Sequence, residues 1–151
     1  SNVTSEPTGF SCVSASSGYG GAGSAAITSR LNASVSSAIV FEGRVWAWPQ
    51  VFGNSDKQPR GLRVGTDPNN AIEFITYSRW AVEARTVASG TVTATQYILP
   101  SGQEVGDWYL TYRIEANLTL AKFYVNGILI ATHTTNIPTG QLNIYMGTLY
   151  D

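Results

Sequence analysis

Apolar and polar side chains alternate along most of this chain, with the period of two that a β-strand requires. Residues 108–116 form the clearest segment. Its apolar side consists of Trp108, Leu110, Tyr112 and Ile114, and its other side of Tyr109, Thr111, Arg113 and Glu115. Such a segment has one face suited to burial and one suited to solvent, like a strand in a sheet that covers a core. No helical stripe of useful length occurs.

Further segments show the same pattern and are separated by turn residues. The strands predicted in this way lie at residues 40–48, 72–77, 80–88, 91–98 and 142–149. Asn126-Gly127 stands between alternating apolar residues and is the strongest hairpin signal in the chain. The turn signals divide the chain into about nine to eleven short strands. The pattern therefore predicts an all-β protein, built as an antiparallel sandwich of two sheets.

The first 24 residues differ in composition from the rest of the chain. They are rich in Ser and Gly, with one short apolar patch at residues 10–13 that predicts a single short strand. Such a segment buries little surface by itself, so its order would depend on docking. We therefore expect an N-terminal arm at residues 1–24 and a sandwich domain at residues 25–151.

The composition excludes some classes of partner. Charged residues make up only 13% of the 151 residues, the net charge is −1, and the basic residues are scattered singly. This distribution argues against nucleic-acid binding. No apolar run approaches the length of a membrane span, so no membrane insertion is expected. A surface rich in Ser, Thr, Asn and Gly is typical of secreted and virion domains, and we expect an extracellular or virion-surface location.

From about residue 39 onward the chain contains, in this order, the segments VFEGRV, GLRVG, AIEFITY, WYLTYRIEA, KFYVNGILIATHTTNIPTG and LNIYMG. This order of segments resembles that of the concanavalin A-like lectin/glucanase superfamily in its laminin G-like form. The resemblance implies a jelly-roll sandwich. The stretch after the Asn126-Gly127 hairpin is also similar to domains of phage virion surface proteins, which implies a structural role.

The sequence offers little evidence of catalysis. Glycosidases of this superfamily carry carboxylates spaced along one strand as Glu-x-Asp-x-x-Glu, and no such run occurs. Glu73, Glu83 and Glu115 stand alone on separate predicted strands, where we expect solvated faces. The single histidine, His133, is expected at the surface, and Cys12 has no cationic neighbours in sequence to activate it. We therefore expect no catalytic residues and a protein that is not an enzyme.

Two loops contain oxygen ligands suited to Ca²⁺, with Asp56 in one and Asp67 and Asn69 in the other. Ordinary β-turns use the same residue types, so no cofactor is expected. Asn2, Asn32 and Asn117 begin Asn-x-Ser/Thr sequons, which are compatible with N-glycosylation but occur at about the frequency expected by chance.

Aromatic residues provide the candidate contact surface. Trp46 and Trp48 share the polar side of their predicted strand with Glu42 and Arg44, and Tyr77, Tyr97 and Tyr109 would add to it. Such rings either stack on sugars or anchor a subunit contact.

Two functions agree best with these patterns, and a third, a hydrolase remnant, is disfavoured by the missing carboxylate run. The first is a non-catalytic structural module of a virion or extracellular surface assembly. It would associate with itself or with other subunits through sheet edges, aromatic patches and the N-terminal arm. The alternative is a lectin-like carbohydrate-binding module.

Overall fold

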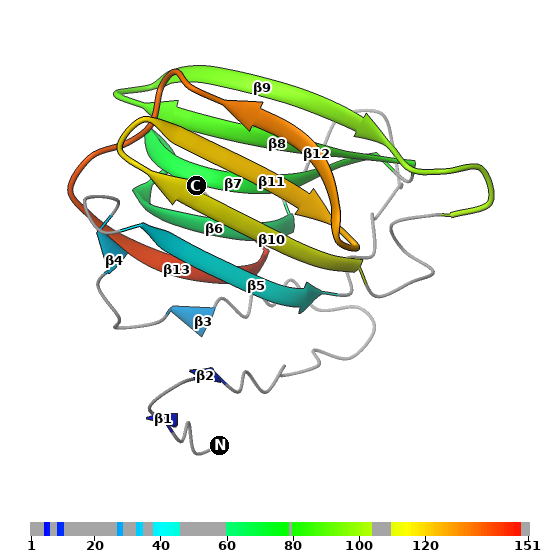
Figure 1. Cartoon of the computed structure of the whole chain (residues 1–151), viewed down its shortest axis with the longest axis horizontal. Helices are drawn as coiled ribbons and strands as arrows, with labels where there is room; N and C mark the ends of the chain where they lie inside the picture. Colours follow the sequence, from blue (N-terminus) through cyan, green and yellow to red (C-terminus); the bar gives the residue numbers. More distant parts are fainter. Residues whose placement is uncertain are drawn as a thin grey trace.

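The computed structural model describes the backbone of residues 38–45, 60–78, 80–103 and 110–148, together with four two-residue strands nearer the N terminus (Figure 1). Side chains are described within residues 38–44, 62–76, 80–103 and 110–144. Strands, turns and irregular segments account for all of these residues. The described part of the chain contains no helix that could cross a membrane.

The structure describes four short strands and nine longer ones. The short ones are β1 (Ser5–Glu6), β2 (Gly9–Phe10), β3 (Ile27–Thr28) and β4 (Ala33–Ser34). The long ones are β5 (Ile39–Val45), β6 (Arg60–Asp67), β7 (Asn70–Ser78), β8 (Ala81–Ala88), β9 (Thr91–Ile98), β10 (Leu110–Asn117), β11 (Leu120–Val125), β12 (Ile128–His133) and β13 (Gln141–Thr148). The predicted strand at residues 91–98 coincides with β9. Within the described residues the other predicted boundaries differ by one or two residues, as at Trp80, which lies in a turn before β8; the predicted strand residues 46–48, 108–109 and 149 lie outside the described residues.

The strands from β3 onward form two antiparallel sheets that lie face to face, and β1 and β2 form a separate two-stranded sheet (Figure 1). The smaller sheet has the order β12-β11-β10-β5. The larger sheet has the order β3-β13-β6-β7-β8-β9, and β4 also pairs with β13. The prediction of an all-β, two-sheet sandwich is therefore confirmed.

The hairpin predicted at Asn126-Gly127 connects β11 to β12, with Val125 opposite Ile128. Both turn residues have positive φ, 49° for Asn126 and 79° for Gly127. This is the backbone that a two-residue turn needs to match the twist of its strands. The Asn126 N–H donates to the Thr111 carbonyl (2.8 Å), and the Asn126 Oδ1 accepts from the Thr111 N–H (2.9 Å). The turn therefore also holds the beginning of β10.

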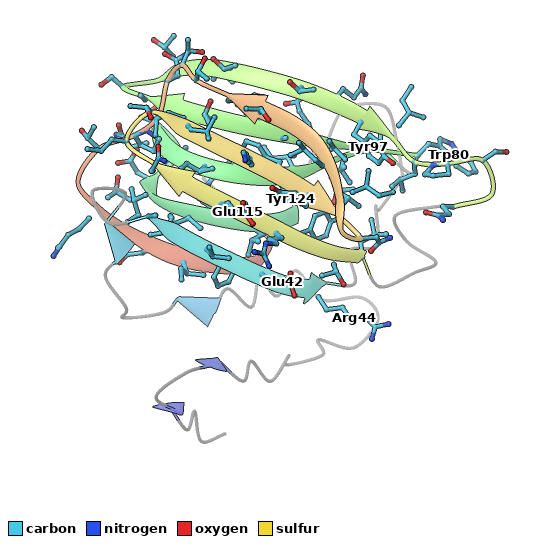
Figure 2. The ribbon with its side chains drawn as sticks, in the orientation of Figure 1. Glu42, Arg44, Trp80, Tyr97, Glu115 and Tyr124 are labelled. Atoms are coloured by element: carbon cyan, nitrogen blue, oxygen red, sulfur yellow. The ribbon has the colours of Figure 1, made fainter. Side chains whose placement is uncertain are left out.

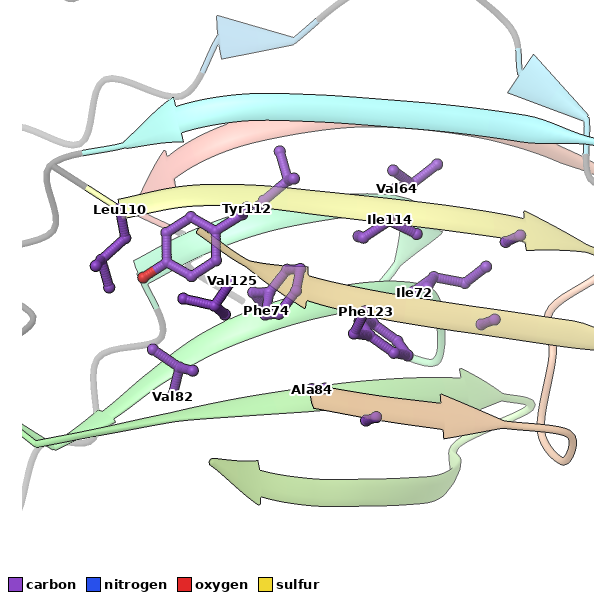
Figure 3. Close-up of a cluster of buried hydrophobic side chains, with 14 of the residues drawn as sticks. Val64, Ile72, Phe74, Val82, Ala84, Leu110, Tyr112, Ile114, Phe123 and Val125 are labelled. Atoms are coloured by element: carbon purple, nitrogen blue, oxygen red, sulfur yellow. The ribbon is translucent and has the colours of Figure 1, made fainter. Parts of the chain in front are cut away.

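The core lies between the two sheets and is built from the inward-facing residues of their central strands (Figure 3). Phe74 of the larger sheet packs against Tyr112 and Phe123 of the smaller one, with ring centroids 4.8 Å and 5.3 Å apart. Their tilted and edge-to-face arrangements are favourable for aromatic pairs. These contacts fix how the two sheets face each other.

The N-terminal segments pair locally or with β13. β1 and β2 pair with each other inside the predicted arm, whereas we expected one strand at residues 10–13. β3 and β4 lie after the arm and pair with the same strand, β13. The boundary between arm and domain at residue 24 stays a prediction.

Candidate functional site

A polar cluster lies on the face of the smaller sheet that points away from the core. Alternation along β5, β10 and β11 turns Glu42, Arg113 and Tyr124 to this face, and the strand register aligns them in one row. In the next row Glu115 stands opposite Lys122. We call Glu42, Arg113, Glu115, Lys122 and Tyr124 the outer-face cluster; Figure 2 labels three of its members.

The carboxylate of Glu115 is the centre of the outer-face cluster. Its Oε1 accepts from Arg113 Nε at 2.9 Å and lies 2.7 Å from Arg113 Nη2. Its Oε2 accepts from the Tyr124 hydroxyl at 3.1 Å. Arg113 Nη1 also reaches Glu42 Oε2 at 3.5 Å. The guanidinium is thus held between two carboxylates, and the position of the Tyr124 ring is fixed by its hydroxyl.

These contacts set the charge of the cluster. The pKa of Glu115 lies below its ordinary value because Arg113 donates hydrogen bonds to the carboxylate, and Tyr124 and Lys122 lower it further. The pKa of the Tyr124 hydroxyl is raised by desolvation and by its bond to Glu115. At neutral pH Glu115 is therefore an ionised carboxylate and Tyr124 a neutral phenol.

A shallow depression adjoins the cluster at the end of the sheet where β5 begins and β10 turns into β11. Its volume is about 240 Å³, and Glu115 and Lys122 line it together with Val40, Asn117 and Leu120. Its lining combines apolar side chains with a few polar groups, and its volume lies below the roughly 300–1,000 Å³ of clefts that enclose a whole drug-sized ligand, so it suits one part of a larger ligand.

A second polar cluster lies on the outer face of the larger sheet, and it corrects one prediction. Arg63, Glu73 and Arg85 stand opposite one another on β6, β7 and β8. Glu73 is only 1% exposed and contacts Arg63 Nε at 2.6 Å and Arg85 Nη1 at 3.4 Å. Arg85 Nε also lies 3.6 Å from Glu83 Oε1. The prediction of a solvated, isolated Glu73 is wrong because two arginines on neighbouring strands neutralise its charge and allow its burial.

His133 is also buried, with 4% of its surface exposed, so the prediction of a surface histidine is wrong. The alternation of β12 turns its ring inward, where it lies 5.0 Å from the Phe123 ring. Thr86 and Thr95, on β8 and β9, hydrogen-bond its two ring nitrogens at 3.1 Å and 2.9 Å. These hydroxyls supply the polar partners that a buried imidazole needs.

The predicted aromatic contact residues are only partly described. Trp46, Trp48 and Tyr109 lie outside the described residues, as does the side chain of Tyr77. Tyr97 is partly buried on the core-facing side of β9 and packs against the core. It lies near Trp80 and away from the outer-face cluster (Figure 2). Among these five residues, Tyr97 is the one whose described side chain can be compared with the predicted contact surface.

The calcium candidates and sequons have local structural roles where they are described. Asp67 accepts from the Asn69 N–H (2.7 Å) and from Thr66 Oγ1 (2.9 Å), so its carboxylate closes a turn. Asp56 lies outside the described residues, and the described part contains no group of three or more potential ligands from His, Cys, Asp and Glu. Asn117 accepts from the Thr119 N–H at 2.9 Å in the β10–β11 turn. Asn2 and Asn32 lie outside the described residues.

Sequence reasoning placed Glu42, Arg113 and Glu115 on wet strand faces but did not bring them together, and it missed Lys122 and Tyr124. The available signal was the hairpin at Asn126-Gly127. It fixes which residues of β11 face outward, but the pairing of β10 with β5 is formed by residues far apart in sequence.

No protein-family model matches the chain, and no curated protein matches it in sequence. Solved structures match it in fold. The carbohydrate-binding module CBM66 of Bacillus subtilis has a TM-score of 0.56 at 16% identity, over 82% of this chain and 73% of the module. The β-glucanase of Bacillus licheniformis has a TM-score of 0.55 at 18% identity, over 80% of this chain and 57% of the glucanase.

The catalytic domain of an endo-1,3-β-glucanase (laminarinase) from Thermotoga petrophila is similar to the same degree. Its TM-score is 0.55 at 13% identity, over 81% of this chain and 56% of that domain. The chain thus spans little more than half the length of the two glucanase chains. At such low identities the likeness concerns the fold.

These comparisons contradict the expectation that the chain is not an enzyme, because glucanases share its fold. That expectation rested on the missing run of carboxylates along one strand. The sheets instead bring carboxylates together from different strands, since Arg85 contacts both Glu73 and Glu83, and Arg113 contacts both Glu42 and Glu115. The absence of a Glu-x-Asp-x-x-Glu run from the sequence is therefore no ground for excluding catalysis.

The narrower likenesses, to laminin G-like domains and to phage virion proteins, stay predictions. The strand order, the two packed sheets and the likeness to a carbohydrate-binding module and to glucanases agree with the broader resemblance. The chain has the concanavalin A-like jelly-roll fold.

Proposed function

We propose that this domain binds carbohydrate through the outer face of its smaller sheet. The observation that carries the proposal is the outer-face cluster, in which Arg113 and Tyr124 hold the Glu115 carboxylate beside an open depression. Sugar hydroxyls act as both donors and acceptors. A guanidinium, carboxylates and a phenol at fixed positions are suited to bind them.

The rigidity of the cluster favours recognition. Glu115 and Arg113 are partly exposed, at 31% and 40% of their side-chain surfaces, so a ligand can reach them. Their mutual hydrogen bonds and the Tyr124 hydroxyl already order their side chains. A ligand would therefore lose little of its binding energy to side-chain ordering.

The apolar part of the depression suits the C–H faces of a sugar ring. Pyranose and furanose rings have C–H faces that pack on apolar and aromatic groups, while their hydroxyls point outward. Val40 and Leu120 provide such apolar contacts beside Glu115 and Lys122. The fold likeness to a carbohydrate-binding module and to glucanases supports the same class of ligand.

The aromatic residues predicted to form a contact surface extend this proposal. Trp46 follows β5 directly in sequence and Tyr109 precedes β10 directly, at the ends where Val45 and Leu110 are paired. Trp46, Trp48 and Tyr109 therefore stay candidates for stacking on a sugar, next in sequence to strands that carry the cluster.

The test is binding of the whole chain to a panel of polysaccharides and arrayed glycans, followed by titration calorimetry on the best ligand. Arg113→Ala and Tyr124→Ala should each weaken binding by about tenfold or more. Gln103→Ala is the matched control, because Gln103 is an exposed residue of the loop that follows β9 of the other sheet. It should leave the affinity unchanged.

Two results would contradict the proposal. One is the absence of specific binding across the panel, and the other is equal loss of affinity in Gln103→Ala and in the cluster variants. Incubating each bound polysaccharide with the protein and measuring released reducing ends would show whether the ligand is also cleaved.

The other functional expectations stay predictions. Incorporation into a virion or extracellular surface assembly, the corresponding location and the use of the sequons are untested by the comparisons. Native mass and neighbours in an isolated particle or filament would test the first two.

A further inference from the structure

β9 is the outermost strand of the larger sheet. It pairs with β8 over eight consecutive residues without a shift in register, from Ala88 opposite Thr91 to Ala81 opposite Ile98. Within the described residues no strand pairs with its other side. β9 thus presents a long, regular row of backbone groups at a sheet edge.

The other sheet edges in the described part of the chain carry features that oppose pairing with a further strand. β5 has the charged residues Glu42 and Arg44 on its outer face. β12 has only six residues and a register irregularity in its pairing with β11. β13 is flanked by β3 and β4. Proteins prevent edge-to-edge association by placing charged side chains on edge strands, by keeping these strands short, by β-bulges, and by covering the edge with other segments.

β9 has none of these features. Its sequence, TVTATQYI, contains no charged residue, proline or glycine. On the side away from the core, Val92 is 43% exposed and Ile98 is 71% exposed, and the exposed Ala94 and Gln96 lie between them. The edge is therefore uncharged, apolar at both ends and regular.

The strand is also held rigidly on its inward side. Thr95 hydrogen-bonds His133, and Thr93 accepts from Asn136 Nδ2 at 2.9 Å and meets Thr135 Oγ1 at 2.8 Å. An edge ordered in this way loses little entropy when another strand is added.

The exposed residues of β9 are complementary to themselves. In an antiparallel pair related by a two-fold axis, residues directly opposite each other must lie on the same face of the joined sheet. A two-fold axis that lies between the two copies of Thr95 and relates them to each other satisfies this condition. It places Val92 opposite Ile98 and Ala94 opposite Gln96, so each exposed large apolar side chain meets another.

We propose that two copies of this chain associate through β9, which pairs antiparallel with β9 of the partner subunit about Thr95 and joins the two larger sheets into one. Main-chain hydrogen bonds along the strands stabilise the dimer, and the two contacts between residues 92 and 98 fix the register. This proposal is independent of carbohydrate binding, which uses the other sheet.

The test uses paired charges at positions 92 and 98 of the full chain. In Val92→Lys/Ile98→Lys, like charges oppose each other twice in the dimer, whereas in Val92→Lys/Ile98→Glu opposite charges do. Both positions are exposed, so the fold should tolerate either variant. The first variant changes the formal net charge from −1 to +1, so its magnitude stays the same and general repulsion is not altered.

Sedimentation velocity over a wide concentration series should show a wild-type dimer. The Lys/Lys variant should raise the dimer dissociation constant by about tenfold or more, and the Lys/Glu variant should lie close to the wild type. In hydrogen-exchange measurements, the β9 amides that point away from β8 should be protected in the wild type and much less in the Lys/Lys variant.

A wild type that stays monomeric throughout the series would overturn the proposal. So would association that is equally strong in wild type and Lys/Lys variant, since the contact would then lie elsewhere. Equal loss of association in both variants would refute the register about Thr95 and with it the proposal as stated.

Discussion

The hydroxyl of Thr86 donates its single proton to the Thr135 carbonyl oxygen at 3.0 Å and therefore accepts from Nδ1 of His133 at 3.1 Å. This relationship assigns the tautomer of the histidine. With the proton on Nδ1, Nε2 accepts from the Thr95 hydroxyl at 2.9 Å when the ring is neutral. The ring thus connects β12 of one sheet to β8 and β9 of the other.

The burial of His133 predicts that the fold is sensitive to acid. Burial lowers the pKa of the ring below its usual 6.5 in the folded protein, so the unfolded chain takes up the proton more readily. The stability from the neutral ring is complete above about pH 6.5 and is lost as the pH falls through the folded pKa. Melting temperatures measured from neutral pH to about pH 5 should fall, and less steeply in His133→Gln. An equal fall of the melting temperature with pH in the wild type and in His133→Gln would contradict this account.

Replacement of Glu73 should destabilise the fold strongly. Glu73→Gln removes the carboxylate that the buried Arg63 and the partly exposed Arg85 both contact. Breaking a buried pair on one side lowers the free energy of unfolding by about 3 kcal/mol or more. Urea denaturation measures this loss. Glu83→Gln is the control and should lose less, because Glu83 is more exposed and lies farther from Arg85. Equal losses in both variants would argue against a special role for the buried pair.

The Asn126 side chain should contribute to stability apart from its backbone conformation. Asn126→Gly retains the positive φ but loses the bond from the Thr111 N–H, so it should lower the free energy of unfolding by about 1 kcal/mol. Asn126→Asp keeps an acceptor at the same position and should lose less. Thermal denaturation of both variants provides the measurement. A glycine variant as stable as the wild type would show that the side-chain bond is not needed.

Removing the hydroxyl of Tyr112 should leave the protein as stable as before, or more stable. The hydroxyl is buried and makes no well-formed hydrogen bond; burial raises its pKa, and the nearby Thr76 hydroxyl lowers that pKa in part. Tyr112→Phe keeps the ring that packs on Phe74 and removes an unsatisfied polar atom, which should raise the free energy of unfolding by up to about 1 kcal/mol. A clear loss of stability in urea denaturation would mean that the hydroxyl has a partner in solution.

Local patterns were enough to predict most of the fold. Alternation located the long strands, because the face of a strand that covers a core must be apolar at every second residue. Asn126-Gly127 located the hairpin, because both residues readily adopt positive φ. These features depend on residues close together in sequence, and so the sequence by itself determined the strands, the hairpin and the two-sheet class.

Only the tertiary structure decided which polar residues meet. Glu42 lies 71 residues from Arg113, and His133 lies 47 residues from Thr86. Alternation assigns a residue to a face but does not say whether that face is covered or which strand lies beside it. For this reason Glu73 and His133 were expected in solvent, whereas arginines and hydroxyls from neighbouring strands compensate their burial. The outer-face cluster likewise exists because β10 pairs with both β5 and β11.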